Sequence, residues 1–167
     1  MILEKVEVRY VRVHPDRPDK NLVKTGAWSL QIFTRDKNQA KEWKDANIKV
    51  KMNEDDEGVY YTSSLSKNCI KADGVTKAEP IEVVNGDLVA LDPGSIGNGT
   101  ICNIRIYQYE VTFEGIKHIK SLPQALQIIK HVVYKNTAGP REEFAKTETE
   151  TIEPTEMPDA EADDFTP

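Results

Sequence analysis

The sequence contains few residues that bind metals, and those present do not fall in a metal-binding pattern. Its two cysteines, Cys69 and Cys102, lie far apart and form no C-x-x-C motif. The histidines His14, His118 and His131 are equally scattered. Zinc sites need clustered ligands at short spacings, so neither a zinc site nor any other metal or cofactor is expected. We expect both cysteines to be reduced, as in a cytosolic protein.

Long apolar runs and catalytic motifs are missing as well. No segment approaches the roughly 20 apolar residues that a transmembrane helix needs. The first ten residues, MILEKVEVRY, alternate charged and apolar side chains from residue 4, unlike a signal peptide. The chain has no G-x-S-x-G, no H-E-x-x-H and no set of residues typical of a nucleophilic site. The sequence therefore predicts a soluble intracellular protein that makes no membrane contact and is not an enzyme.

Acidic residues are plentiful but unevenly distributed. Residues 141–167 carry ten acidic and two basic side chains, a net charge of −8, whereas the whole chain carries −6. The preceding part is therefore faintly basic, at +2. Because the acidic segment has few core-forming side chains, it cannot offset the entropy cost of folding. We predict an ordered domain over residues 1–138 and a disordered acidic tail over residues 139–167.

Period-two alternation of apolar and polar residues dominates the ordered part. Val6, Val8 and Tyr10 alternate with Glu7 and Arg9, which predicts a half-buried strand. Further strands are expected at 28–33, 59–67, 80–91 with an internal Asn-Gly turn, 100–113 and 125–135. A short helix is expected at 36–47 with Asp36 as its N-cap, and turns at 54–58 and 92–99. These elements predict a mainly β fold, either a small barrel or a sandwich.

The glycine-rich run GSIGNG (94–99) allows two interpretations. A phosphate-binding loop would need a helix N-terminus or a cradle of backbone amides behind it. No Lys-Ser/Thr follows here, and the next element is a predicted strand. We interpret the run as a turn in which glycines supply positive φ angles.

The predicted strand 100–113 has two chemically different faces. Ile104 and Ile106 share one face, and Asn103, Arg105, Tyr107 and Tyr109 share the other. Unpaired bases stack on such rings, and a nearby cation can follow the phosphates. The alternative is that the tyrosines pack under a loop with their hydroxyls in water.

A second basic and aromatic set lies earlier in the chain. Phe33 and Arg35 share a face of the second predicted strand, Lys49 and Lys51 share a face of the following extended segment, and Lys67 ends the next strand. Individual lysines are usually only solvated. Gathered around aromatic side chains, these cations would form the phosphate-following rim of a groove.

The acidic tail ends in EADDFTP, which places Phe165 directly after Asp163 and Asp164. One interpretation is that the tail merely keeps the protein soluble. The other is that the ring anchors in a basic pocket while the carboxylates steer it there. Such a pocket could belong to a partner protein or to the domain's own cationic groove, where the tail would compete with a nucleic acid.

Four segments together resemble the phage-encoded single-stranded DNA-binding proteins with an OB fold: VRYVRVH (8–14), KEWKDA (41–46), ALDPGSIGNGTICNIRIYQYE (90–110) and LPQALQIIKHVVY (122–134). The resemblance covers roughly residues 5–135. It implies a five-stranded OB-fold barrel that binds single-stranded DNA without sequence preference in phage replication, recombination or repair. It also implies a location in the cytoplasm of the infected bacterial host.

The resemblance extends to individual residues. Tyr107 and Tyr109 look like the Tyr-x-aromatic pair that contributes to DNA binding in that family. The Asp-Asp-Phe at 163–165 is similar to the family's contact for the phage DNA polymerase and helicase-primase. One departure is that Thr166 and Pro167 follow the phenylalanine, which puts in doubt a docking mode that needs a free carboxylate on that ring's residue.

Two other functions are weighed against this one. The chain could be an adaptor whose acidic tail binds a basic partner while the barrel serves as a scaffold. An enzyme of nucleotide metabolism is disfavoured because no catalytic set is present. The sequence leaves the oligomeric state open, a homodimer included.

Overall fold

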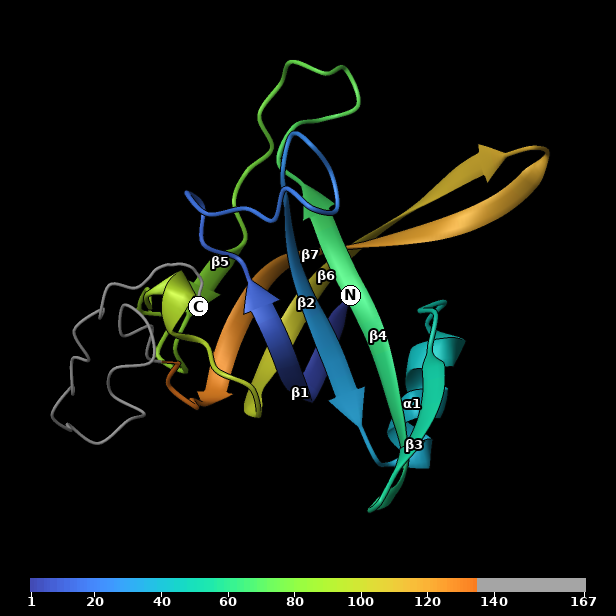
Figure 1. Cartoon of the computed structure of the whole chain (residues 1–167), viewed down its shortest axis with the longest axis vertical. Coiled ribbons are helices and arrows are strands. Elements are labelled where there is room, and N and C mark those ends of the chain that lie inside the picture. Colours follow the sequence, from blue (N-terminus) through green and yellow to red (C-terminus); the bar gives the residue numbers. More distant parts are fainter. Residues whose placement is uncertain (135–167) are drawn as a thin grey trace, which may run out of the picture. The chain divides into compact units, whose positions relative to one another are not determined.

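The computed structural model describes residues 1–134. The predicted tail, its boundary at residue 138 and its Asp163–Phe165 motif lie outside the described residues. The long strands are β1 (Ile2–Arg12), β2 (Ala27–Thr34), β4 (Gly58–Asn68), β6 (Thr100–Phe113) and β7 (Ile116–Lys130). The shorter elements are α1 (Lys37–Asp45), β3 (Lys51–Asp55), β5 (Glu82–Val84) and the 3-10 turn η1 (Pro93–Ser95). Figure 1 shows how these elements are arranged.

The strands form one sheet in the order β3-β4-β2-β1-β6-β7-β5. All neighbours are antiparallel except β5, which runs parallel to β7. β4 and β7 are separated by three strands in this order, yet they pack against each other. The five long strands therefore curl into a barrel. The predicted mainly β fold with a short helix is confirmed for the described part of the chain.

The barrel is filled by the apolar side chains that alternate inward along its strands. Val6, Ile32, Ile104 and Leu126 are all essentially inaccessible to solvent. Helix α1 adds Trp43, which is also buried in this core. Apolar burial of this kind is the main favourable contribution to folding, because it removes hydrocarbon surface from water.

The start of α1 agrees with the prediction. Asp36 is the N-cap, and its side chain accepts a hydrogen bond from the backbone N–H of Asn38 at 2.8 Å. This bond satisfies one of the amides that the first helical turn leaves without a partner.

β1 departs from a regular strand at two positions. Lys5 and Tyr10 both have a φ of 51°, and the pairing register with β6 and β2 shifts there. Each position is a β-bulge, which adds one residue to β1 and changes the direction of the side chains. Val6 and Val8 are buried as predicted, but Tyr10 is 64% exposed. The prediction that Tyr10 continues their alternation is therefore wrong.

Beyond the barrel, β6 and β7 continue as a two-stranded ribbon that we call the arm, residues 107–122. It extends away from the other strands (Figure 1, yellow and orange). Its tip is the turn Glu114–Gly115, in which both residues have positive φ, as tight hairpin turns require. Near its base, Gln108 donates a hydrogen bond from Nε2 to the carbonyl of Ala46 at 2.7 Å, which ties the arm to the end of α1.

The last strand begins earlier and ends earlier than predicted, at 116–130 instead of 125–135. The observed strand contains Pro123, although proline cannot donate to a ladder and is rare inside strands. Here Pro123 is buried opposite Ile106, beside the register shift that separates this pair from Arg105 and Ala125. The irregular pairing accommodates the proline without ending the strand.

The predicted strand 80–91 is reduced to β5 at 82–84. The Asn-Gly turn after it is held by Asn85, whose Oδ1 accepts hydrogen bonds from the backbone N–H groups of Asp87 and Val89. The positive φ of this turn falls on Leu88, at 65°, and not on Gly86. The predicted turn is present, but its backbone differs from that of a two-residue hairpin.

The glycine-rich segment is a turn, as interpreted, but its glycines serve different purposes. Gly99 has a positive φ of 94°. Gly97 does not, but a Cβ there would lie 2.8 Å from the carbonyl oxygen of Val132. Gly97 therefore permits a close backbone approach, and only Gly99 fits the prediction about φ.

Three observations bear on the expected absences. Within residues 1–134, no helix is long and apolar enough to cross a membrane. The same residues contain no cluster of three or more His, Cys, Asp or Glu side chains suited to a metal. Cys69 and Cys102 are not bonded to each other. Burial raises the pKa of the Cys102 thiol to about 12, which keeps it protonated.

Candidate nucleic-acid interface

The outer surface of β2 and β4 carries a hollow rich in cations and rings, which we call the aromatic face. It encloses about 420 Å³, and the groups that distinguish it are Arg9, Tyr10, Phe33, Lys49, Lys51 and Tyr60. Strand register explains why they meet. Phe33 lies opposite Thr62, and Thr62 lies opposite Lys51, so these positions share one side of the sheet. The face therefore unites Phe33, Lys49 and Lys51, which the sequence predicted as binding residues.

Phe33 lies at the base of a stack of side chains. The guanidinium carbon of Arg9 lies 3.7 Å from the centroid of its ring, and the ring of Tyr60 lies 5.3 Å away. This cation–π contact holds the guanidinium against the ring, and Phe33 is only 5% exposed. Arg9 and Tyr60 are thus more accessible to a ligand than Phe33. Arg9 also donates from Nε to Oε2 of Glu7 at 3.1 Å, which leaves its two terminal nitrogens for a phosphate. The stacking role of Phe33 stays a prediction, and the structure adds that the ring supports Arg9.

Arg35 is already engaged by a carboxylate. Its Nη1 and Nη2 donate to Oδ1 and Oδ2 of Asp55 at 3.1 and 2.7 Å. This hydrogen-bonded pair lowers the pKa of Asp55 and raises that of Arg35. Both side chains line a neighbouring hollow of about 580 Å³, together with Lys5, Glu7 and Glu57. A phosphate at Arg35 would have to displace Asp55, so the predicted contact requires a rearrangement.

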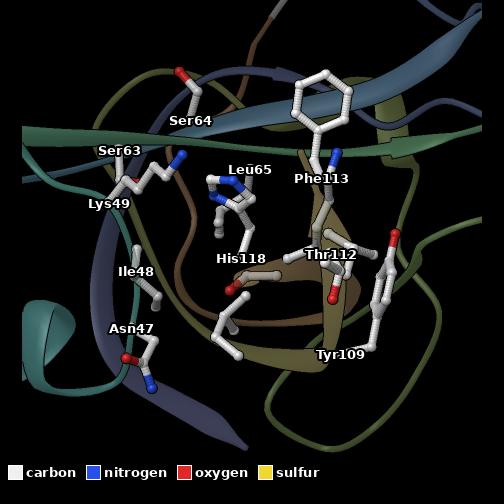
Figure 2. A pocket seen from close by; sticks show the side chains of 14 residues that line it. Asn47, Ile48, Lys49, Ser63, Ser64, Leu65, Tyr109, Thr112, Phe113 and His118 are labelled. Atoms are coloured by element: carbon white, nitrogen blue, oxygen red, sulfur yellow. The ribbon is translucent and has the colours of Figure 1, made fainter. Parts of the chain in front are cut away.

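A larger hollow lies between the arm and the edge of the barrel, and we call it the arm groove. It encloses about 650 Å³, and its arm side includes Tyr109, Phe113, His118 and Lys120. Its barrel side includes Lys49, Ser63 and Ser64, which also line the aromatic face. Figure 2 shows Lys49 and Ser63 across the hollow from Tyr109 and Phe113. The two hollows are therefore neighbours, and Lys49 lies on their common border.

The predicted tyrosine pair forms a stack at the base of the arm. The ring centroids of Tyr107 and Tyr109 are 5.8 Å apart with an angle of 22° between the planes. Tyr107 is 51% exposed, whereas Ile104 and Ile106 are buried. The prediction that β6 has one buried aliphatic face and one exposed face is confirmed for the residues up to Tyr107. Tyr109 lines the arm groove, whereas Tyr107 and Arg105 are exposed on the same side and line none of these hollows.

Lys67 lies apart from the other predicted cations. It is opposite Trp28 on β2 and is partly buried, and it lines none of the hollows. Burial lowers the pKa of its ammonium group, and the like charge of Lys71 adds to this effect, whereas Glu79 opposes it. Its predicted phosphate contact stays a prediction that the geometry does not favour.

Six side chains of the two hollows that carry a ring or a basic group were not among the predicted site residues: Arg9, Tyr10, Tyr60, Phe113, His118 and Lys120. Arg9 alternates outward along β1, so the period of two contained a signal for it. Only strand register could show that it covers Phe33. His118 belongs to the second strand of the arm, which was not predicted there, whereas Phe113 ends the predicted strand 100–113 but was not identified as a site residue.

Comparison with known proteins gives structural matches alone. No family model and no curated protein matches the sequence. The fold is similar to gp2.5, a single-stranded DNA-binding protein encoded by bacteriophage T7, with a TM-score of 0.54 and 11% identity over 91% of this chain and 99% of that one. It is also similar to the single-stranded DNA-binding protein of bacteriophage Enc34 in complex with single-stranded DNA. There the TM-score is 0.53 and the identity 14%, over 78% of this chain and 86% of that one.

These matches cover most of the chain and concern its fold. The five long strands correspond to the OB-fold barrel that the sequence resemblance implied, so the predicted fold is confirmed. β3, β5 and the arm are additional to a minimal five-stranded barrel.

Proposed function

We propose that this chain binds single-stranded DNA without sequence preference along the path formed by the aromatic face and the arm groove. The observation that carries the proposal is that both hollows share Lys49, Ser63 and Ser64. A strand lying there would meet rings on both sides of a central cation. Stacking tolerates every base, and cations follow the phosphates, so such a surface binds unpaired nucleic acid without reading its sequence.

The structural matches support the ligand class. The proteins from T7 and Enc34 are single-stranded DNA-binding proteins, and the Enc34 protein was solved with single-stranded DNA. The side chains support it independently, because Arg9, Lys49 and Lys51 line the same hollow as the ring of Tyr60. On this basis the protein protects unpaired DNA during phage replication or recombination.

A titration with fluorescein-labelled oligo-dT tests the proposal through fluorescence anisotropy. Neutralising a phosphate of single-stranded DNA contributes about −0.7 to the slope of log K against log salt. Contacts from Arg9, Lys49 and Lys51 would therefore give a slope of about −2, which is ~100-fold weaker binding at 500 mM than at 50 mM salt. A duplex of equal length serves as the comparison. No binding at 50 mM salt would contradict the proposal and favour the adaptor hypothesis.

We also propose a role for the acidic segment 139–167. Its net negative charge resembles that of a nucleic acid, and the aspartates at 163 and 164 precede an aromatic anchor. The segment would compete with DNA for the cationic path and, once displaced, would bind a basic site on the phage DNA polymerase or helicase-primase.

Removing residues 141–167 is expected to tighten oligo-dT binding several-fold at low salt, because it removes a net charge of −8. The gain should shrink at high salt, where such attraction is screened. Replacing Phe165 with Ala in the full chain is the control, since it leaves the charge in place and should leave DNA affinity unchanged. Equal affinities of the full and shortened chains would show that the tail does not visit the site.

A further inference from the structure

Tyr10 has a backbone conformation that aromatic residues rarely adopt. Its φ of 51° lies in the left-handed region that glycine, asparagine and aspartate visit most readily. Its side chain is 64% exposed, so burial of the ring does little to offset the strain. Strained residues that persist in a fold cluster at functional sites, where the position of the side chain matters. Tyr10 is therefore a candidate for such a role.

The bulge determines where this ring points. Between Arg9 and Arg12, β1 contains one residue more than the facing part of β2. In a regular strand Arg9 and Tyr10 would project to opposite sides of the sheet. Here both line the aromatic face. The extra residue thus brings an exposed aromatic residue to the same hollow as Arg9.

The glycine-rich turn holds the bulge in place through Asn98. The backbone N–H of Tyr10 has left the strand ladder and donates to Oδ1 of Asn98 at 2.8 Å. The next residue, Gly99, donates its N–H to the carbonyl of Val8 at 3.0 Å. The turn is therefore attached to β1 at two points, and the N–H that the bulge releases from the ladder has a partner.

The same arrangement occurs at the other bulge of β1. The backbone N–H of Lys5 donates to Oδ1 of Asn103 at 3.0 Å, and Lys5 also has a φ of 51°. Its side chain lines the hollow next to the aromatic face, together with Arg9. The two bulges thus bring Tyr10 and Lys5 to neighbouring hollows on this surface. In each bulge, an asparagine side chain accepts the hydrogen bond of the backbone N–H.

We propose that Tyr10 is a base-stacking position of the DNA site and that Asn98 is the positioning residue that holds its ring on the aromatic face. The inference rests on the proposed function and extends it to β1. A base stacked on Tyr10 would place its phosphate within reach of Arg9, which lines the same hollow.

Replacing Tyr10 with Gly separates binding from stability. Glycine adopts positive φ without strain, so the urea midpoint should stay equal or rise, whereas oligo-dT binding should weaken ~10-fold through loss of the ring. Tyr10→Phe keeps the ring and should bind within ~2-fold of the original chain. Leu88→Gly is the matched control, because Leu88 is also exposed with a φ of 65° but lines none of the hollows. Its DNA affinity should not change.

A double-mutant cycle tests the role of Asn98. Asn98→Ala alone should weaken binding several-fold, because the ring is no longer held in place. In the Tyr10→Gly background the same substitution should have no further effect beyond ~2-fold. If instead the two effects multiply, Asn98 acts independently of the ring and the positioning role is wrong.

The outcomes distinguish this inference from the function on which it rests. If the unaltered chain fails to bind oligo-dT, the proposed function and the role of Tyr10 are both overturned. If the unaltered chain binds and Tyr10→Gly binds equally well, the proposed function stands and the role of Tyr10 alone is overturned.

Discussion

Replacing Tyr107 and Tyr109 together with alanine is expected to weaken oligo-dT binding ~30-fold or more while the barrel stays folded. A base stacked on an aromatic side chain contributes roughly 1–3 kcal/mol. The two rings already lie stacked, with centroids 5.8 Å apart and planes inclined by 22°, so they form one platform. Losing about 2 kcal/mol of stacking corresponds to the stated change in affinity. Anisotropy at a fixed salt concentration measures it.

The control is the double replacement Tyr107→Phe/Tyr109→Phe, which keeps both rings and removes only the hydroxyls. It should bind within ~2-fold of the unaltered chain. Circular dichroism and the urea midpoint check that the alanine variant is folded. This is expected because Tyr107 is half-exposed and the core lies on the other face of β6. Unchanged binding by the alanine variant would remove these rings from the site and confine it to the aromatic face.

Charge reversal at Lys49 is expected to weaken binding more than ~10-fold at 50 mM salt, and the deficit should shrink at 500 mM. Lys49 lines both hollows, so a carboxylate there would repel the strand at the point where it passes between them. The repulsion is screened over about 10 Å at 0.1 M salt, which explains the salt dependence. Lys51→Glu should have a smaller effect, since Lys51 lines only the aromatic face.

Lys37→Glu provides the matched control for net charge. Lys37 is exposed at the start of α1 and lines none of the hollows. The substitution changes the charge of the protein by the same amount as Lys49→Glu does. Equal losses of affinity in the two variants would mean that overall charge, and not the junction at Lys49, governs binding. The neutral variant Lys49→Ala should reduce the salt slope by about 0.7.

The sequence alone predicted the elements that depend on interactions between residues close together in the chain. The alternation along 100–107 follows from a strand with one face in the core, and the observed burial agrees with it. Asp36 could be identified as an N-cap because capping is a local hydrogen bond. The turn predicted at 54–58 is present but shorter, at residues 56–57 between β3 and β4.

The composition of the site depends on contacts that are distant in the sequence. Alternation placed Phe33 on the outer face, but only the pairing of β1 with β2 shows that Arg9 covers it. The second strand of the arm lies before the predicted start at residue 125. It contains Pro123, which local propensity disfavours inside a strand and which the adjacent register shift with β6 accommodates. Tyr10 was placed on the wrong side, since a bulge shifts the alternation by one residue and leaves no local signal.

The two edge strands of the sheet, β3 and β5, affect how copies of this chain would pack beside one another on DNA under the proposed function. β5 is three residues long, and β3, the sequence KMNED, is mostly charged or polar. An exposed strand edge recruits strands from other chains unless it is short or carries charges. Under the proposed function, several copies would lie along one DNA molecule at high local concentration. With edges of this kind, neighbouring copies can lie in contact without joining their sheets and aggregating.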